Sequence, residues 1–196
     1  MRSIEIKINN VDDYNKFIKK IKRYKVIFYK NKKFINSSNK IFKDIPFIIE
    51  ALNIKNKKKR IDYVYDYCCK YIDEYCTNKN YCEFKNNKCL TQYNNNYFNG
   101  CCRGCRYQSN NGCTTSNITF KLFYCNKVKE KHKVVTKDDL KILNCLPFRN
   151  RVIVSHDFFV SREEMLKDLH LNSLLIFSFK TLLRFRYIRK ITKSNQ

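Results

Sequence analysis

The sequence predicts a mainly α-helical protein with a small N-terminal α/β element and an irregular cysteine-rich core between helices. Apolar residues recur at helical intervals over much of the 196-residue chain. The first residues instead alternate apolar and polar side chains, as a half-buried strand does. Neither period continues through residues 77–97, so no secondary structure is predicted there. These three observations together define the predicted fold class.

The first 56 residues are predicted to form a basic region of strands and helices. A short strand is expected at residues 3–8. Two aspartates then suit the first turn of a helix over residues 12–21. Residues 26–29 predict a second strand, and residues 31–39 predict a polar connection.

Two further helices are predicted on either side of the basic run 57–60. Asp44 is the expected N-cap of the first helix, with Pro46 in its first turn. The second helix covers residues 60–76, where apolar side chains recur at intervals of four and three. Cys68 belongs to this apolar seam and is therefore expected in the core.

The C-terminal third predicts three short elements. A helix is expected at residues 137–145, with Cys145 as a core residue at its end. Residues 152–154 predict an extended segment. Ser161 and Glu164 have the spacing of a capping box, which predicts that a helix begins there.

Residues 171–191 combine a wide apolar face with basic residues. Such a helix suits an anionic membrane surface. A helix that covers the core of the same domain explains the pattern equally well and is the preferred interpretation. The chain shows no uncharged apolar span of about 18 residues, and its N-terminus lacks the apolar run of a secretory signal. A cytoplasmic location is therefore expected.

The formal net charge of +24 is unevenly distributed. Residues 1–60 hold 18 Lys and Arg against 5 Asp and Glu, residues 61–125 hold 7 against 5, and residues 126–196 hold 16 against 7. Basic flanks of this kind are typical of nucleic-acid binding. The abundance of Lys, Asn, Ile and Tyr also fits the composition of an AT-biased genome, which is the preferred explanation.

Residues 57–196 are predicted to form one helical domain that contains a cysteine cluster at 82–125. In a reducing compartment, closely spaced thiols favour metal ligation over disulfides. A zinc ion takes four ligands and an iron–sulfur cluster generally takes four thiolates, so seven cysteines suffice for one site with spare thiols or for two sites. The irregular core is therefore predicted to be metal-stapled. The candidate metal ligands are Cys82, Cys89, Cys101, Cys102, Cys105, Cys113 and Cys125.

The most informative unit of the cluster is the C-x2-C pair of Cys102 and Cys105. Two thiolates at this spacing reach one ion, and Gly104 between them permits the tight turn. The adjacent Cys101 points in another direction along an extended backbone and is assigned to a second site or to packing. Cys76, at the end of its helix, is the nearest cysteine before the cluster. The isolated histidines, which are not expected to be ligands, are His132, His156 and His170.

Residues 82–125 also resemble a known family. The order Gly100-Cys101-Cys102, Cys105 with Tyr107, Gly112-Cys113-Thr114 and Phe123-Tyr124-Cys125 is similar to that of the zinc- or iron-chelating cysteine-cluster proteins of the YkgJ type. Two features differ: the C-x2-C that ordinarily precedes the cysteine pair is here Cys82-x6-Cys89, and a further cysteine before the last one is missing. The resemblance implies metal chelation and no particular reaction.

The leading hypothesis is a cytoplasmic metal-binding protein whose cysteine cluster chelates Zn²⁺ or an iron–sulfur cluster, in a structural or redox role. The alternative is a zinc-stabilised nucleic-acid-binding module that uses the basic flanks. The sequence shows no nucleophile with a base, no P-loop and no dinucleotide-binding motif. An enzyme is therefore the less favoured class, and no catalytic residue or small-molecule substrate is predicted.

Overall fold

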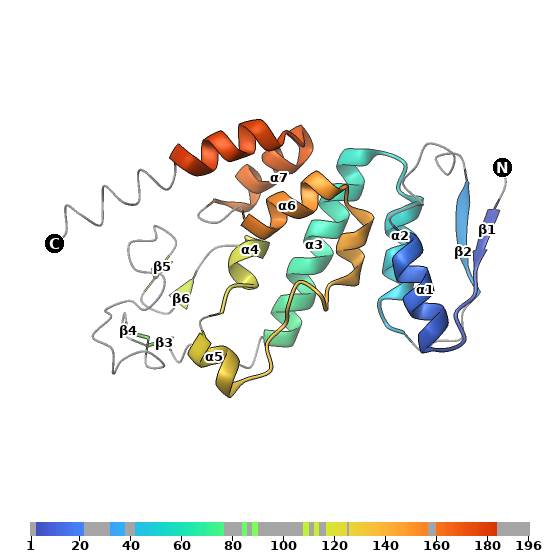
Figure 1. The fold of residues 1–196 in the computed structure, drawn as a ribbon, viewed down its shortest axis with the longest axis horizontal. Coiled ribbons are helices and arrows are strands. Elements are labelled where there is room, and N and C mark those ends of the chain that lie inside the picture. The colour runs from blue at the N-terminus through green and yellow to red at the C-terminus, as the bar shows by residue number, and fades with distance from the viewer. Residues whose placement is uncertain are drawn as a thin grey trace. The chain divides into compact units, whose positions relative to one another are not determined.

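The computed structural model describes residues 3–21, 32–37, 42–76, 84–85, 88–89, 108–109, 112–113, 117–124, 126–156 and 160–183. The predicted mainly α-helical class with a small N-terminal α/β element is confirmed, because the described chain is mainly helical with a small parallel sheet near its N-terminus (Figure 1). The metal-stapled cysteine core stays a prediction. The internal contacts divide the chain into two units, Met1–Cys68 with Lys137–Val152 (unit 1) and Cys69–Thr136 with Ile153–Gln196 (unit 2). The sequence-based boundary between residues 56 and 57 stays a prediction. Among the described helices, none has both the length and the apolar character needed to cross a membrane.

The sheet of unit 1 consists of β1 (Ser3–Ile6) and β2 (Lys33–Asn36), which pair in parallel. The predicted polar connection at residues 31–39 is therefore wrong where β2 lies. Phe34 is buried, and the side chain of Asn53 holds its backbone. The Phe34 N–H donates to Asn53 Oδ1 and Asn53 Nδ2 donates to the Phe34 carbonyl, each at 2.8 Å. The strand predicted at residues 26–29 lies outside the described residues.

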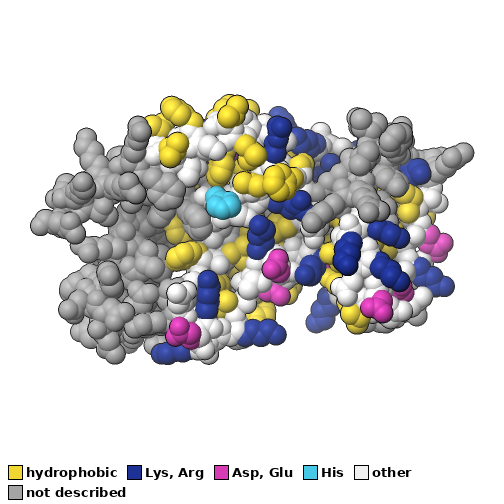
Figure 2. All heavy atoms as spheres, in the orientation of Figure 1, with side chains coloured by type: hydrophobic (Ala, Val, Ile, Leu, Met, Phe, Trp, Pro, Cys, Tyr) yellow, Lys and Arg dark blue, Asp and Glu magenta, His cyan; other side chains and the backbone are white. Residues whose placement is uncertain are grey.

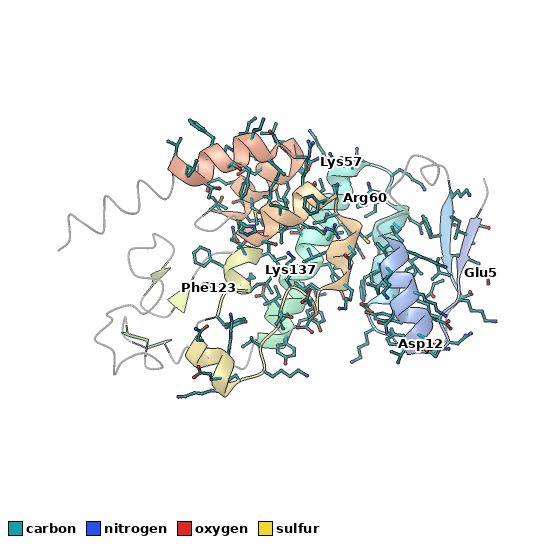
Figure 3. The ribbon with its side chains drawn as sticks, in the orientation of Figure 1. Glu5, Asp12, Lys57, Arg60, Phe123 and Lys137 are labelled. Carbon is teal, nitrogen blue, oxygen red and sulfur yellow. The ribbon has the colours of Figure 1, made fainter. Side chains whose placement is uncertain are left out.

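Helix α1 (Val11–Ile21) connects the two strands and carries Asp12 in its first turn (Figure 3). Its apolar face buries Phe17 and Ile21. Helices α1 and α2 lie on the same side of the sheet (Figure 1). The acidic first turn and the buried apolar face are those that the sequence predicts.

Helix α2 (Ile45–Asn53) begins after Asp44, the predicted N-cap residue. The Asp44 side chain makes no capping hydrogen bond to the helix. Its carboxylate instead accepts a hydrogen bond of 2.7 Å from the hydroxyl of Tyr14, whose ring stacks on Phe42 at 4.2 Å between centroids. Asp44 therefore attaches α1 to the start of α2.

The remaining elements of unit 1 come from distant parts of the chain. Helix α3 (Lys57–Cys76) contributes its first half, and the predicted helix at 137–145 is present as the 3-10 helix η4 (Lys141–Cys145), which contacts α1 and α2. The extended segment predicted at 152–154 is wrong, because these residues belong to helix α6 (Phe148–His156). Helix propensities of β-branched residues are only a few tenths of a kcal/mol below those of better helix formers, and burial of Ile153 and Val154 outweighs such a difference.

In unit 2, the predicted capping box opens helix α7 (Arg162–Leu171). The Glu164 N–H donates to Ser161 Oγ at 3.2 Å, and the Ser161 N–H donates to Glu164 Oε2 at 3.0 Å. The helix ends at Asn172, whose φ of 53° is left-handed. A further helix follows at residues 174–183.

Candidate metal centre

The structure describes the backbone at two of the seven predicted metal ligands. Cys89 ends strand β4 (Lys88–Cys89), and Cys113 ends strand β6 (Gly112–Cys113). The other candidate ligands lie outside the described residues. They are Cys82, Cys101, Cys102, Cys105 and Cys125.

Strand β4 forms a hairpin with β3 (Phe84–Lys85). The strands are antiparallel, with Phe84 opposite Cys89 and Lys85 opposite Lys88, so two residues connect them. Both connecting residues are asparagines, which are favoured in two-residue hairpin turns because they tolerate positive φ. The prediction that residues 77–97 lack secondary structure is therefore wrong at this hairpin.

Strand β6 forms a second hairpin of the same kind with β5 (Gln108–Ser109). Gln108 lies opposite Cys113 and Ser109 lies opposite Gly112. Two asparagines again connect the strands. In both hairpins, the cysteine is the last residue of the second strand and pairs with the first residue of the first strand.

The register reveals a local repetition that the sequence analysis missed. Residues 82–89 read CEFKNNKC and residues 105–113 read CRYQSNNGC. Each stretch begins and ends with cysteine, has an aromatic residue two positions after the first cysteine, and has Asn-Asn before the penultimate residue. The second stretch is one residue longer, which hides the repetition when cysteine spacings alone are compared. The paired Asn-Asn dipeptides were the signal from which it could have been found.

In the sequence, the first cysteine of each stretch comes shortly before the residue that pairs with the second cysteine. Cys82 precedes Phe84, the residue opposite Cys89, by two positions. Cys105 precedes Gln108, the residue opposite Cys113, by three positions. Thiolates are preferred ligands of Zn²⁺ and of iron–sulfur clusters. The chemistry of this donor set therefore fits either group.

Between Cys113 and Cys125 of the cluster, Asn117 fixes the chain to the core of unit 2. It is the N-cap of α4 (Ile118–Lys121), where its Oδ1 accepts from the N–H groups of Thr119 at 2.7 Å and Phe120 at 3.2 Å. Its Nδ2 donates to the carbonyl of Val160 at 3.3 Å. Asn117 is fully buried, so these bonds satisfy polar groups that water does not reach.

Upstream of the cluster, the last turns of α3 contact residues 121 and 133, which lie on either side of Cys125 in the sequence. Asp73 forms an ion pair with Lys121 of α4. The Tyr75 hydroxyl donates to the carbonyl of Lys133 at 3.4 Å, just after α5 (Asn126–Lys131). The two ends of the cysteine segment are therefore held together within unit 2, which lowers the entropy cost of ordering the loop between them.

The cysteines predicted to be core residues are core residues. Cys68 and Cys145 are both fully buried. The Cys145 thiol lies 3.9 Å from the carbonyl oxygen of Ile48, within reach of a weak S–H hydrogen bond. Cys69 is half-buried on α3. Burial explains Cys68 and Cys145 by packing rather than by ligation.

The histidines lie on separate elements. His156 is exposed at the end of α6, whereas His132 and His170 are half-buried, after α5 and within α7. The described part of the chain contains no group of three or more His, Cys, Asp or Glu side chains that are placed to hold a metal ion. The prediction of ligands at 82–125 therefore depends on residues whose side chains the structure does not describe.

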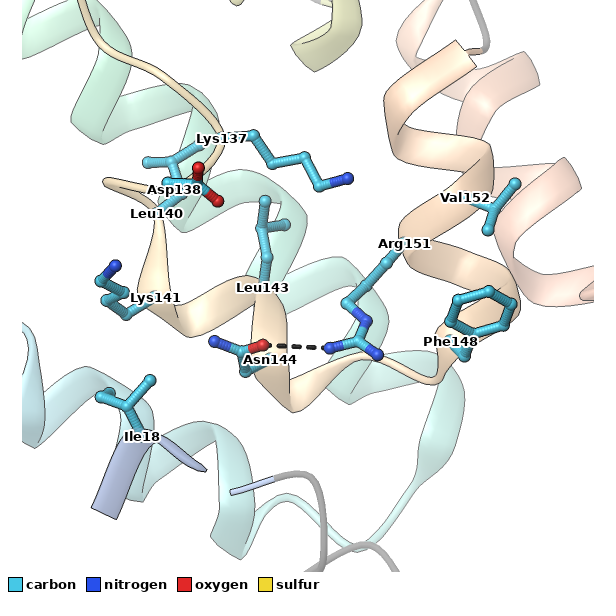
Figure 4. A pocket seen from close by; sticks show the side chains of 10 residues that line it. All are labelled: Ile18, Lys137, Asp138, Leu140, Lys141, Leu143, Asn144, Phe148, Arg151 and Val152. Atoms are coloured by element: carbon cyan, nitrogen blue, oxygen red, sulfur yellow. Dashed lines mark hydrogen bonds between the residues drawn. The ribbon is translucent and has the colours of Figure 1, made fainter. Parts of the chain in front are cut away.

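Unit 1 contains a cavity of about 300 Å³ beside η4 and the start of α6 (Figure 4). Its charged side chains are those of Lys137, Asp138, Lys141 and Arg151, with a net charge of +2. Arg151 Nη1 donates to Asn144 Oδ1 at 3.0 Å, and burial lowers the pKa of Arg151. None of the residues that line the cavity is Cys or His, so it is not part of the candidate metal centre.

Two other side chains of unit 1 have displaced pKa values. Burial lowers the pKa of Arg60, which extends from α3 (Figure 3). The pKa of Tyr63 is raised, first by burial and then by the 2.7 Å hydrogen bond that its hydroxyl donates to Glu50. Both side chains keep their ordinary protonation state at neutral pH. The ordinary pKa values of arginine and tyrosine lie far above 7, so Arg60 stays charged and Tyr63 stays neutral. They are structural contacts of α3.

No family model, no curated protein and no solved structure matches the chain. The resemblance of residues 82–125 to the YkgJ-type proteins therefore stays a prediction.

Proposed function

We propose that this chain is a metal-binding protein in which the cysteine-rich segment between α3 and α5 chelates Zn²⁺ or an iron–sulfur cluster, in a structural or redox role. One observation carries the proposal: hairpins β3–β4 and β5–β6 share one register, and each ends at a cysteine that follows another cysteine at a similar spacing. Hairpins that present pairs of thiolates are a common way to build a site for a soft metal centre.

Physical stability supports the same proposal. A hairpin with two residues in each strand is not stable by itself in water. The cysteine segment also contains few of the apolar residues with which it would build a separate core. Structural zinc contributes on the order of 10 kcal/mol to the folding of such a segment. Metal ligation is therefore a sufficient source of order for these two hairpins.

The chain offers a specific ligand assignment. We assign one pair of thiolates to each of the two cysteine stretches, Cys82 with Cys89 and Cys105 with Cys113. Cys102 shares a C-x2-C unit with Cys105 and completes the set around the second hairpin. Cys102, Cys105 and Cys113 make three thiolates, so Cys82, Cys89, Cys101 and Cys125 supply the fourth ligand or form a second site. Bound metal requires these thiols to be deprotonated, so metal uptake releases protons and weakens as the pH falls.

The test is elemental analysis combined with an absorption spectrum of untagged protein that is prepared without oxygen. A colourless protein with stoichiometric zinc indicates a zinc site, whereas iron with visible absorption indicates a cluster. We expect Cys89→Ser and Cys113→Ser each to lose bound metal. Cys69→Ser is the matched control, since it makes the same thiol-to-hydroxyl change on the half-buried α3 position and should keep the metal. Full metal content in both hairpin variants would refute the proposal.

Zinc-stabilised nucleic-acid binding is the alternative function. It requires that the basic flanks bind phosphate, so binding should fall steeply with salt. Binding that is no tighter than that of a control protein of similar net charge would exclude it.

A further inference from the structure

The helix at residues 174–183 carries a group of exposed apolar side chains. Leu175 is 85% exposed, Phe179 is 64% exposed and Leu182 is 61% exposed, and Figure 2 shows hydrophobic side chains along this part of unit 2. Single exposed apolar residues are ordinary, whereas a contiguous group marks an interaction surface. We call this group the apolar stripe. Its members are Leu175, Ile176, Phe179, Leu182 and Leu183.

The spacing of these residues makes the stripe continuous. At 100° per residue, all five members fall within an arc of about 120° of the helix. Phe177, which is buried, lies on the opposite side. Leu171, the last residue of α7, is also exposed. The preferred interpretation from the sequence, that this helix covers the core, is therefore wrong for the stripe.

The opposite side of the helix is attached to unit 2. Phe177 provides the apolar contact, and Lys180 forms an ion pair with Asp168 of α7. The Asp168 side chain is 2% exposed, so this pair is partly shielded from water. These contacts fix the rotation of the helix about its axis. The stripe consequently faces away from the protein.

The part of the sequence that contains the stripe and follows it carries charges of one sign. Residues 172–196 contain no Asp or Glu. Lys180 is paired with Asp168, and five further basic residues follow the described helix in the sequence. They are Arg184, Arg186, Arg189, Lys190 and Lys193. An apolar face with adjacent basic residues is the combination that binds anionic lipid surfaces. The apolar side chains insert at the acyl-chain boundary, and the basic side chains are attracted to the anionic headgroups.

We propose that the apolar stripe docks the protein on the surface of an anionic membrane. The helix lies on the bilayer rather than across it, because its ten described residues span about 15 Å, about half of the hydrocarbon thickness. A second copy of the chain is a less suitable partner, because residues 172–196 of both copies carry only basic charges, which repel one another. This inference is independent of the proposed metal site.

The test is cosedimentation of the full chain with vesicles made of equal parts phosphatidylcholine and phosphatidylglycerol. Binding to pure phosphatidylcholine vesicles should be at least about tenfold weaker, because the headgroup charge is lost. The stripe variant Leu175→Asn/Phe179→Asn should bind anionic vesicles at least about tenfold less tightly than the natural chain. Metal content should not change in this variant, so its result and that of the metal proposal are separable.

A matched control removes one exposed aliphatic and one exposed aromatic residue elsewhere. Val11 is 61% exposed and Phe148 is 67% exposed, both in unit 1. Val11→Asn/Phe148→Asn should bind anionic vesicles within about twofold of the natural chain. The natural chain has no Trp, so Leu175→Trp adds a direct reporter, whose emission should move to shorter wavelengths on anionic vesicles.

Two results would overturn the proposal. Equal vesicle binding by the natural chain and the stripe variant would show adsorption by net charge alone. Absence of vesicle binding, together with a dimer that the stripe variant dissociates, would assign the stripe to a second copy. Circular dichroism and thermal melting check that the variants fold. The single change Leu175→Asn serves as a second variant, because a side chain that is 85% exposed contributes little to packing.

Discussion

Asn117 anchors the cysteine segment to unit 2, and its replacement gives a quantitative test of this anchor. Its Oδ1 accepts from the N–H groups of Thr119 and Phe120, and its Nδ2 donates to the carbonyl of Val160. The side chain is fully buried, so water cannot replace these bonds without opening the structure. Asn117→Ala removes the side-chain partner of all three backbone groups at once.

The expected cost has two parts. Loss of an N-cap side chain costs about 1 kcal/mol, with a range of about 0.5 to 2. Loss of the donor to a buried carbonyl costs about 1 to 3 kcal/mol. Asn117→Ala should therefore lower the free energy of unfolding by about 2 to 4 kcal/mol, a large part of the 5 to 15 kcal/mol of a typical domain. Asn117→Ser keeps an oxygen that can cap α4 and should cost about half as much.

Urea unfolding of protein with known metal content measures these changes. A lower urea midpoint at constant m-value reports a change in stability rather than in the surface area exposed on unfolding. Asn15→Ala, at an exposed position of α1, is the matched control and should stay within about 0.5 kcal/mol of the natural chain. The reasoning is refuted if Asn117→Ala is equally harmless. Equal losses for the Ala and Ser variants would refute the capping contribution alone.

Three further predictions concern the sheet, the metal and acid stability. Asn53→Ala removes both hydrogen bonds to the Phe34 backbone, so the Phe34 amide should exchange faster with deuterium and stability should fall by about 2 kcal/mol. Cys105→Ser should lose stoichiometric metal and make residues 77–125 protease-sensitive, while Cys145→Ala should keep the metal; the reverse pattern would place the centre elsewhere. Hydrogen bonds lower the pKa of Glu163, first from its own backbone N–H and then from Ser161. The charged carboxylate therefore stabilises the fold at pH values above 4.5, the ordinary pKa. This stabilisation is lost as the pH falls through the lower pKa of the folded state. Glu163→Gln should flatten the loss of stability below pH 4.5, and an unchanged acid profile would contradict this.

The sequence alone determined the elements that local signals specify. The capping box of Ser161 and Glu164 was predictable because both of its hydrogen bonds join residues three apart. The apolar seam of α3 was predictable for a similar reason, since helical periodicity repeats within a few residues, and it correctly placed Cys68 in the core. The cysteine cluster was recognised by composition, but the pairing of Phe84 with Cys89 and of Gln108 with Cys113 was not, because strand register depends on the turn rather than on cysteine spacing.

Elements that depend on distant partners could be assigned only from the folded chain. The sequence of strand β2 predicts a strand only weakly. The strand forms because it pairs with β1 and because Asn53 of α2 makes two hydrogen bonds to the Phe34 backbone. Helix α6 overrides the strand preference of residues 152–154, since burial contributes more free energy than local propensity. The direction in which the apolar stripe faces could not be predicted from the sequence either. An amphipathic pattern shows that a helix has an apolar face, but the ion pair of Lys180 with Asp168 and the burial of Phe177 decide where that face points.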